Sequence, residues 1–120
     1  MSDDNLPVIL LTCSGISHTG RLTTQAANEL RRRNPHLIAR HVRMTALKIP
    51  LEEAVEGEER LVIVDGCEEC CAKKRTDALG IAPALYLVAT REGIIKRGME
   101  EARYDEIETL SQAITRKIWE

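Results

Sequence analysis

The chain has 120 residues, of which 43% are hydrophobic and 30% charged, and its formal net charge is -2. This balance is typical of a folded protein, excludes a disordered or fibrous chain, and predicts a single domain over residues 1–120. The weak net charge and the 2% of aromatic residues exclude the basic surface and the stacking platforms expected of a nucleic-acid-binding protein.

Strand and helix alternate through the first half of the chain. VILLT (8–12) is a short, wholly apolar run with β-branched residues and predicts a buried strand. Apolar residues then recur every fourth position and predict a helix over 19–33, which an Asn-Pro pair ends. Residues 36–44 predict a second strand, and residues 45–57 a loop with a short helix.

The same alternation continues through the second half. RLVIVDG (60–66) predicts another buried strand, followed by a helix over 67–79 that a glycine closes. Residues 83–90 predict a further strand, and 91–98 a turn with a short return segment. Residues 104–119 place four aliphatic side chains on one helical face and predict the last helix.

This order of elements predicts an α/β fold. Strands that are apolar along their whole length are typical of a parallel sheet covered on both faces. We therefore expect a three-layer domain with a mainly parallel sheet of four or five strands, in the flavodoxin-like order 2-1-3-4.

Three of the four cysteines lie within residues 67–71, directly after an apolar run. Cys13 follows the first expected strand in the same way. Because the first and third strands are neighbours in this order, Cys13 and the cluster should face one crevice at the carboxyl edge of the sheet. If Cys67 opens its helix, Cys70 and Cys71 lie within one turn of it, where the helix dipole lowers thiol pKa values.

The two loops at this edge contain residues suited to shaping a site. His18, in the loop CSGISHTG (13–20), is a candidate metal ligand, because imidazole binds zinc alongside thiolates. Asp65 is suited to cap the helix that follows, and Gly66 to allow a sharp bend. Small residues of the first loop are expected to form a nest of amides that holds an anion or shapes a metal pocket; they are Gly15, Ser17, Thr19 and Gly20. Ser14 and Gly15 are expected to shape this loop.

Two segments, CSGISHTGRLTTQAANEL (13–30) and VDGCEECCAKK (64–74), resemble the motifs of the DGC domain family, which is described as zinc-binding. The family pattern has a Cys-Ser-Gly loop, Thr-Gly and a helix, then Asp-Gly-Cys and, four residues after that cysteine, Cys-Ala. The matching positions are Cys13, Ser14, Gly15, Thr19, Gly20, Asp65, Gly66, Cys67, Cys71 and Ala72. The resemblance covers nearly the whole chain.

One position departs from that pattern. The family tends to have a further cysteine after the second strand, in a Met-x-Cys-Leu context, whereas this chain has Ala46 within MTAL (44–47). Cys70 is instead an additional cysteine. The zinc site that the resemblance implies therefore carries over only for Cys13, Cys67 and Cys71.

The residues themselves leave three interpretations of the thiols. The first is a zinc site formed by Cys13, Cys67 and Cys71, with Cys70, His18 or water as the fourth ligand, because thiolates favour zinc. The second is a thiol redox or transfer enzyme in which Cys67 attacks and Cys70, Cys71 or Cys13 resolves. The third is that the thiols only fill a helix-sheet interface, although adjacent cysteines on a helix point in different directions.

The expected function is metal binding in a sensing or transfer role, with zinc as the cofactor. Hydrolysis is not expected, because the sequence positions no catalytic base. The acidic start, MSDDNLPVILL, does not resemble a signal peptide, and no apolar run approaches a membrane span. We therefore expect the cytoplasm, where thiols stay reduced. Neither nucleic acid nor a membrane is an expected partner, which leaves a protein or a small thiophilic ligand.

Overall fold

Four parallel strands form one sheet in the order β2-β1-β3-β4. The computed structural model describes residues 7–46, 49–57 and 59–120. The α/β prediction and the flavodoxin-like strand order are both confirmed, with four strands in the sheet. The strands are β1 (Val8–Thr12), β2 (Ile38–Arg43), β3 (Arg60–Asp65) and β4 (Leu85–Val88).

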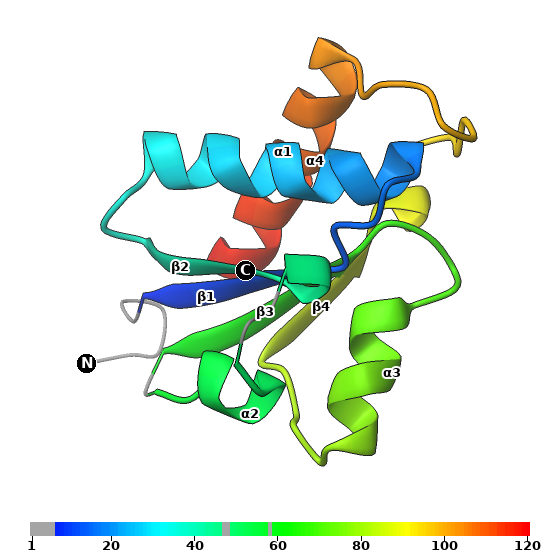
Figure 1. Ribbon diagram of the computed structural model, residues 1–120. Coiled ribbons are helices and arrows are strands. Elements are labelled where there is room, and N and C mark those ends of the chain that lie inside the picture. The colour runs from blue at the N-terminus through cyan, green and yellow to red at the C-terminus, as the bar shows by residue number, and fades with distance from the viewer. Residues whose placement is uncertain (1–6, 47–48, 58) are drawn as a thin grey trace.

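Helices cover both faces of the sheet, which gives the three expected layers (Figure 1). The helices α1 (His18–Arg33) and α4 (Tyr104–Trp119) pack against one face. The helices α2 (Leu51–Ala54) and α3 (Cys71–Ala78) lie on the other face. No helix in the described part of the chain is long and apolar enough to cross a membrane.

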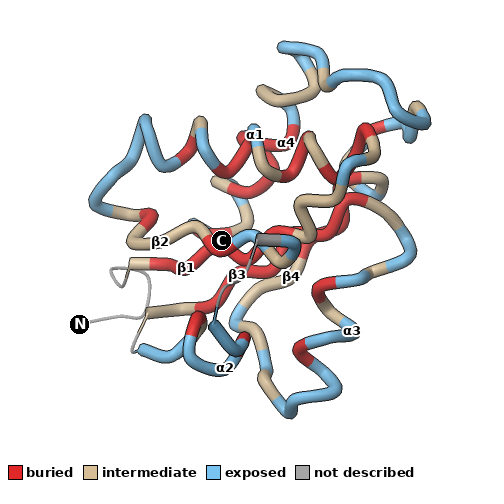
Figure 2. The backbone as a smooth tube through the Cα atoms, in the orientation of Figure 1, coloured by how far each residue is buried: buried red, intermediate tan, exposed pale blue. Residues whose placement is uncertain are grey.

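Of the central strands, β1 is buried along its whole length and β3 from Leu61 onward, as Figure 2 shows. Alternate residues of each strand point to opposite faces, so β1 supplies Val8 and Leu10 to the core beneath α1 and α4. It supplies Ile9 and Leu11 to a second core beneath α2 and α3. Two separate cores explain why these strands have no polar alternation.

The chain reverses its direction of winding between β1 and β3. Helix α1 leads from β1 outward to β2, whereas α3 leads from β3 outward to β4 on the other side. The carboxyl ends of β1 and β3 therefore form the topological switch point, the usual ligand-binding crevice of open α/β sheets. The backbone amide of Cys13 still pairs with the Val64 carbonyl at 3.3 Å, so the two strand ends remain side by side.

Two expected boundaries were wrong. Helix α3 begins at Cys71 and not at Cys67, because residues 67–70 form a turn before it. Strand β4 ends at Val88 and not at residue 90, because a 3₁₀ helix follows over Ala89–Arg91, after which residues 92–103 contain neither helix nor strand. Residues 1–6, with the acidic start, and residues 47–48 of the expected loop lie outside the described residues.

A polar cluster joins the start of α1 to the start of α4. Buried His18 lies 3.0 Å from a carboxylate oxygen of Glu106 through its Nε2 atom, and its Nδ1 accepts from the Arg97 amide at 3.3 Å. The Arg97 guanidinium donates to the same carboxylate at 2.6 Å. Desolvation opposes ionisation of Glu106, but the hydrogen bonds from Arg97 and His18 outweigh it and lower its pKa to about 2.

We expect Glu106→Gln to lower the free energy of unfolding at pH 7 by about 1 to 3 kcal/mol, because it removes a hydrogen-bonded carboxylate from this cluster. A depressed folded-state pKa stabilises the protein above the unfolded value near 4.5 and loses that effect as the pH falls toward 2. Urea unfolding should therefore show that the difference in free energy of unfolding between wild type and Glu106→Gln becomes smaller as the pH falls across this range.

Glu108→Gln is the matched control on the same helix. Glu108 pairs with Arg33 at 2.8 Å, and both side chains are more than a third exposed, at 39% and 37%. Solvent screens such a pair, so the change should be within about 1 kcal/mol. Equal losses in the two variants would contradict the role of the Glu106 cluster.

Candidate metal centre

Cys13 begins the loop that follows β1, and its thiol faces the neighbouring loop. The amide of Gly66 points at Cys13 Sγ at 3.3 Å, and the hydroxyl of Thr23 on α1 lies 3.8 Å from the same sulfur. The thiol is half-buried. The fold thus brings Cys13 directly beside the start of the 66–71 segment, as the sequence predicted.

The other three cysteines lie in a turn and at the start of the helix after it. The amide of Cys70 donates to the carbonyl of Cys67 at 3.1 Å, which closes the turn. Cys70 has a left-handed backbone, with φ at 52°, and Cys71 is the first residue of α3. The expectation that all three thiols share one helical turn is therefore wrong. All four thiols are free.

Asp65 caps α3 from the end of β3. Its carboxylate accepts hydrogen bonds from the amides of Ala72 and Lys73 at 2.9 and 3.1 Å. These amides lie in the first turn of the helix and have no partner within it. The hydroxyl of Tyr86 on β4 donates to the same carboxylate at 3.1 Å. The prediction that Asp65 caps this helix is confirmed, and the cap fixes both ends of the segment that holds Cys67 and Cys70.

The pKa of Cys71 is raised and not lowered as the helix position predicted. Partial removal of the sulfur from water is the largest cause, followed by the negative charges of Asp65, Cys13, Glu69 and Cys67. Asp65 occupies the amides at the helix start, so its carboxylate offsets the helix dipole there. A cation bound beside Cys71 would offset these negative charges.

Tyr86 lies at the back of the cysteine turn. Desolvation raises its pKa above the usual range, and the neighbouring acidic groups, the Cys70 thiol and the Asp65 carboxylate, add to this effect. The Cys70 thiol therefore lies near the Tyr86 hydroxyl on β4.

Ser14 is held in an unusual backbone conformation by its neighbours. Its φ is 49°, a left-handed value that is unfavourable for residues other than glycine. Its amide donates to the Thr23 hydroxyl at 3.3 Å, its carbonyl accepts from Thr45 at 2.8 Å, and its own hydroxyl accepts from Thr24 at 2.6 Å. These contacts hold the loop that begins at Cys13.

A further chain of hydrogen bonds connects Ser14 to His41 on β2. The Ser14 hydroxyl contacts that of Thr12, which lies 2.8 Å from His41 Nε2. The other ring nitrogen faces the amide oxygen of Asn28 at 3.2 Å. Since that oxygen only accepts, Nδ1 is assigned the proton and Nε2 accepts from Thr12. Burial of the ring, with the charges of Arg43 and Arg31, lowers the His41 pKa to about 4, which favours the neutral ring at pH 7.

His18 is not directed toward the thiols. Both of its ring nitrogens have partners in the cluster with Glu106 and Arg97, so binding a metal would require one of those contacts to break. The expected nest of amides is also partly occupied. The His18 amide donates to the Gly98 carbonyl at 2.9 Å, and the Gly20 amide donates to the side chain of Ser17, the N-cap of α1, at 3.3 Å.

Two glycines allow the loops to approach each other. A Cβ atom on Gly66 would lie 2.8 Å from the backbone of Thr19, and one on Gly20 would lie 2.6 Å from the backbone of Gly15. Gly66 is therefore required for close approach to α1 rather than for the bend that the sequence suggested. Gly15, by contrast, has no atom within 4 Å of its Cβ position.

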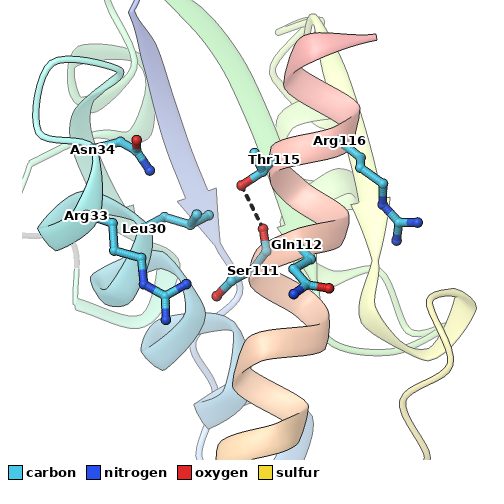
Figure 3. Close-up of a pocket in the computed structure, with 7 residues that line it drawn as sticks. All are labelled: Leu30, Arg33, Asn34, Ser111, Gln112, Thr115 and Arg116. Carbon is cyan, nitrogen blue, oxygen red and sulfur yellow. Dashed lines mark hydrogen bonds between the residues drawn. The ribbon is translucent and has the colours of Figure 1, made fainter.

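Two of the cavities lie in different regions of the molecule. The larger, of about 420 Å³, separates the end of α1 from the middle of α4, where Ser111 and Leu30 face each other (Figure 3). The other, of about 310 Å³, adjoins the candidate centre and is lined by Cys67, Glu68, Glu69, Thr90 and Lys96. Cys67 is therefore the candidate ligand that an incoming molecule reaches from this cavity.

The four thiols suit a thiophilic ion by their chemistry and by their common position at one sheet edge. Within residues 7–46, 49–57 and 59–120, however, no three His, Cys, Asp or Glu side chains are already arranged to hold a metal ion. What the structure shows is that the loop of Cys13 and the segment of Cys67 meet, since the Gly66 amide contacts Cys13 Sγ and Gly66 directly precedes Cys67.

Several residues at this edge were not predicted from the sequence. The ammonium group of Lys96 lies 3.6 Å from Cys67 Sγ, although Lys96 belongs to an irregular segment without periodicity. Tyr86 on β4 donates to Asp65, a contact that the sequence did not predict. Thr12 and Thr23 are fully buried. A buried polar residue can indicate a functional site, but the burial of these two can be recognised only once their positions on β1 and α1 are known.

Comparison with protein families gives one match. The family model described as DGC domain matches residues 9–114, nearly the whole chain. The matched region includes all four cysteines, Asp65 and both loops of the switch point. No curated protein and no solved structure matches the sequence.

We expect Gly66→Ala to destabilise the protein by about 1 to 3 kcal/mol, because its Cβ must displace the backbone of Thr19. Gly15→Ala is the matched control in the facing loop, since its Cβ enters open space, and it should change stability by less than about 1 kcal/mol. Urea denaturation of both variants provides the comparison. Equal stability of the two would show that the loops do not pack as closely as described.

The neutral His41 ring makes stability fall in mild acid. Its folded pKa of about 4 lies below the ordinary value of 6.5, so the unfolded chain binds the proton first and stability falls between these two pH values. The loss should be on the order of 1 to 2 kcal/mol, because solvent screens the partly exposed ring. His41→Gln should remove this step from the pH profile of unfolding; an unchanged step would assign it to another group.

Proposed function

The chain belongs to the DGC domain family, and on this premise we propose that it binds zinc, or a similar thiophilic metal ion, at the carboxyl edge of its sheet. The proposed ligands are the thiolates of Cys13, Cys67 and Cys71. The role that follows is metal sensing or metal transfer.

The observation that supports this proposal most strongly is the meeting of two cysteine loops at the switch point. The Gly66 amide contacts the sulfur of Cys13, so Cys67 begins one residue from that thiol. Thiolate ligands from separate loops give a soft donor set that favours zinc over harder ions. The left-handed residues Ser14 and Cys70 adjoin the proposed ligands Cys13 and Cys71, and strained residues of this kind gather at functional sites.

The fourth ligand distinguishes a closed site from an open one. His18 is engaged by Glu106 and Arg97, so it is not available for the fourth position. Cys70 is the thiol of this chain that remains for it. Its side chain must leave Tyr86 to reach the ion. While Cys70 remains beside Tyr86, water or a thiol of another molecule completes the tetrahedron, as in sites that keep an exchangeable position.

The proposed setting follows from the chemistry of the thiols. Zinc thiolate sites need reduced cysteines, so we place the protein in a reducing compartment such as the cytoplasm. The partner would be a protein or a small molecule with a thiolate of its own, because only such a ligand competes well for the same ion.

One observation favours a second candidate function, a thiol redox or transfer enzyme. The closed turn places Cys67 and Cys70 in a Cys-x-x-Cys arrangement, and Lys96 faces the sulfur of Cys67. In this alternative Cys67 attacks a disulfide and Cys70 resolves the mixed disulfide. The two candidates differ in whether Cys13 is essential.

Protein purified without added metal or chelator should contain about one zinc ion per chain by elemental analysis. Cys13→Ser, Cys67→Ser and Cys71→Ser should each weaken zinc binding at least about a hundredfold in competition with a chromophoric chelator. The reason is that each thiolate supplies a substantial part of the roughly 10 to 16 kcal/mol that a four-ligand zinc site gains.

His36→Gln is the control, because it removes an exposed imidazole away from the switch point and should leave affinity unchanged. Metal-free protein with freely reactive thiols, a Cys67–Cys70 disulfide under mild oxidation and full disulfide-reductase turnover by Cys13→Ser would instead establish the redox function.

A further inference from the structure

Lys96 is the cation that contacts a candidate ligand directly. Its Nζ atom lies 3.6 Å from Cys67 Sγ, within contact distance for an ammonium group and a sulfur. Both side chains line the same cavity of about 310 Å³. The contact joins the irregular segment 92–103 to the cysteine turn, so residues far apart in the sequence meet at this point.

The other charged residues that line the cavity are two carboxylates, and Lys96 is itself exposed to solvent. Glu68 forms a two-pronged ion pair with Arg91, with a shortest contact of 2.7 Å, and Thr90 also lies near its carboxylate. Glu69 is exposed. Arg91 is thereby engaged by a carboxylate, which leaves Lys96 as the cation that faces the sulfur of Cys67.

The segment that presents Lys96 is anchored on both sides. Ile94 is buried in the core beneath α1 and α4. The amide of Arg97 donates to His18 at 3.3 Å, and its guanidinium bonds Glu106. These anchors hold the backbone at Lys96 in place, so the position of its ammonium group beside Cys67 does not depend on a free loop.

We propose that Lys96 is a positioning residue that pairs with the Cys67 thiolate and offsets the charge of the metal centre. The inference rests on the proposed function. Zinc with three thiolates has a net charge of -1, and a fourth thiolate makes it -2, so a cation beside one sulfur stabilises the loaded state. No bond to the metal is assigned to Lys96.

The first test measures zinc affinity by chelator competition in Lys96→Gln, Lys96→Arg and Lys117→Gln. Lys96→Gln should weaken binding about fivefold, the effect of one charge at roughly 4 Å in a high dielectric. Lys96→Arg should stay within about twofold of wild type, because it keeps the charge. Lys117→Gln removes the same charge from the far end of α4 and should change nothing. The effect of Lys96→Gln should also diminish at high salt.

The second test needs no metal. In protein whose Cys13, Cys70 and Cys71 are serine, only Cys67 reacts with alkylating agents. The rate with anionic iodoacetate divided by the rate with neutral iodoacetamide reports the local charge, because the fraction of thiolate cancels. Lys96→Gln should lower this ratio about threefold, as expected for removing a charge at roughly 6 Å.

The two tests separate the inference from the proposed function. Wild-type zinc binding that Lys96→Gln leaves unchanged would overturn the inference and leave the function standing. Absence of zinc binding in wild type would overturn the proposed function and the role of Lys96 in a metal centre. An equal alkylation ratio in wild type and Lys96→Gln would overturn the Lys96–Cys67 pairing, whether or not the protein binds zinc.

Discussion

The cap that Asp65 places on α3 is the contact on which the cysteine edge depends. The carboxylate is buried at the end of β3, yet it accepts two amides of α3 and the hydroxyl of Tyr86, so its removal from water is compensated. It fixes the distance between the end of a strand and the start of a helix. The five residues between them, 66–70, have little freedom, and they hold Cys67 and Cys70 in one turn.

The loop on the other side of the switch point is fixed by different means. Ser14 is held through its amide, hydroxyl and carbonyl by threonines of α1 and the segment after β2, and through Thr12 it reaches a neutral His41. Two loops that are each restrained by protein groups can meet only because Gly66 lacks a Cβ. The candidate centre is therefore built from rigid backbone with soft, rotatable thiols placed on it.

The sequence was sufficient for the fold because the strong signals were local. Uninterrupted apolar runs identified parallel strands buried on both faces, and the positions of Cys13 and Cys67 after two such strands placed them at one edge. The cap Asp65 was predicted, but the start of α3 was placed four residues too early, because residues 67–70 form a turn between the cap and the first residue of the helix. The partners of His18 and Lys96 were not predicted, because they are distant in the sequence and only tertiary packing brings them together. Arg97 is 79 positions from His18, and Cys67 is 29 positions from Lys96.

The difference between a backbone held by protein contacts and thiols that can rotate bears on what a metal would do here. In a structural zinc domain the ion supplies the folding free energy, and the ligands have no fixed positions without it. Here two aliphatic cores order the sheet, and protein hydrogen bonds hold both cysteine loops. An ion at this edge is not needed to form the backbone around it, so its release need not unfold the domain. A site with that property suits exchange of the ion with a partner better than permanent retention, and the cavity at Cys67 provides access for the exchanging ligand.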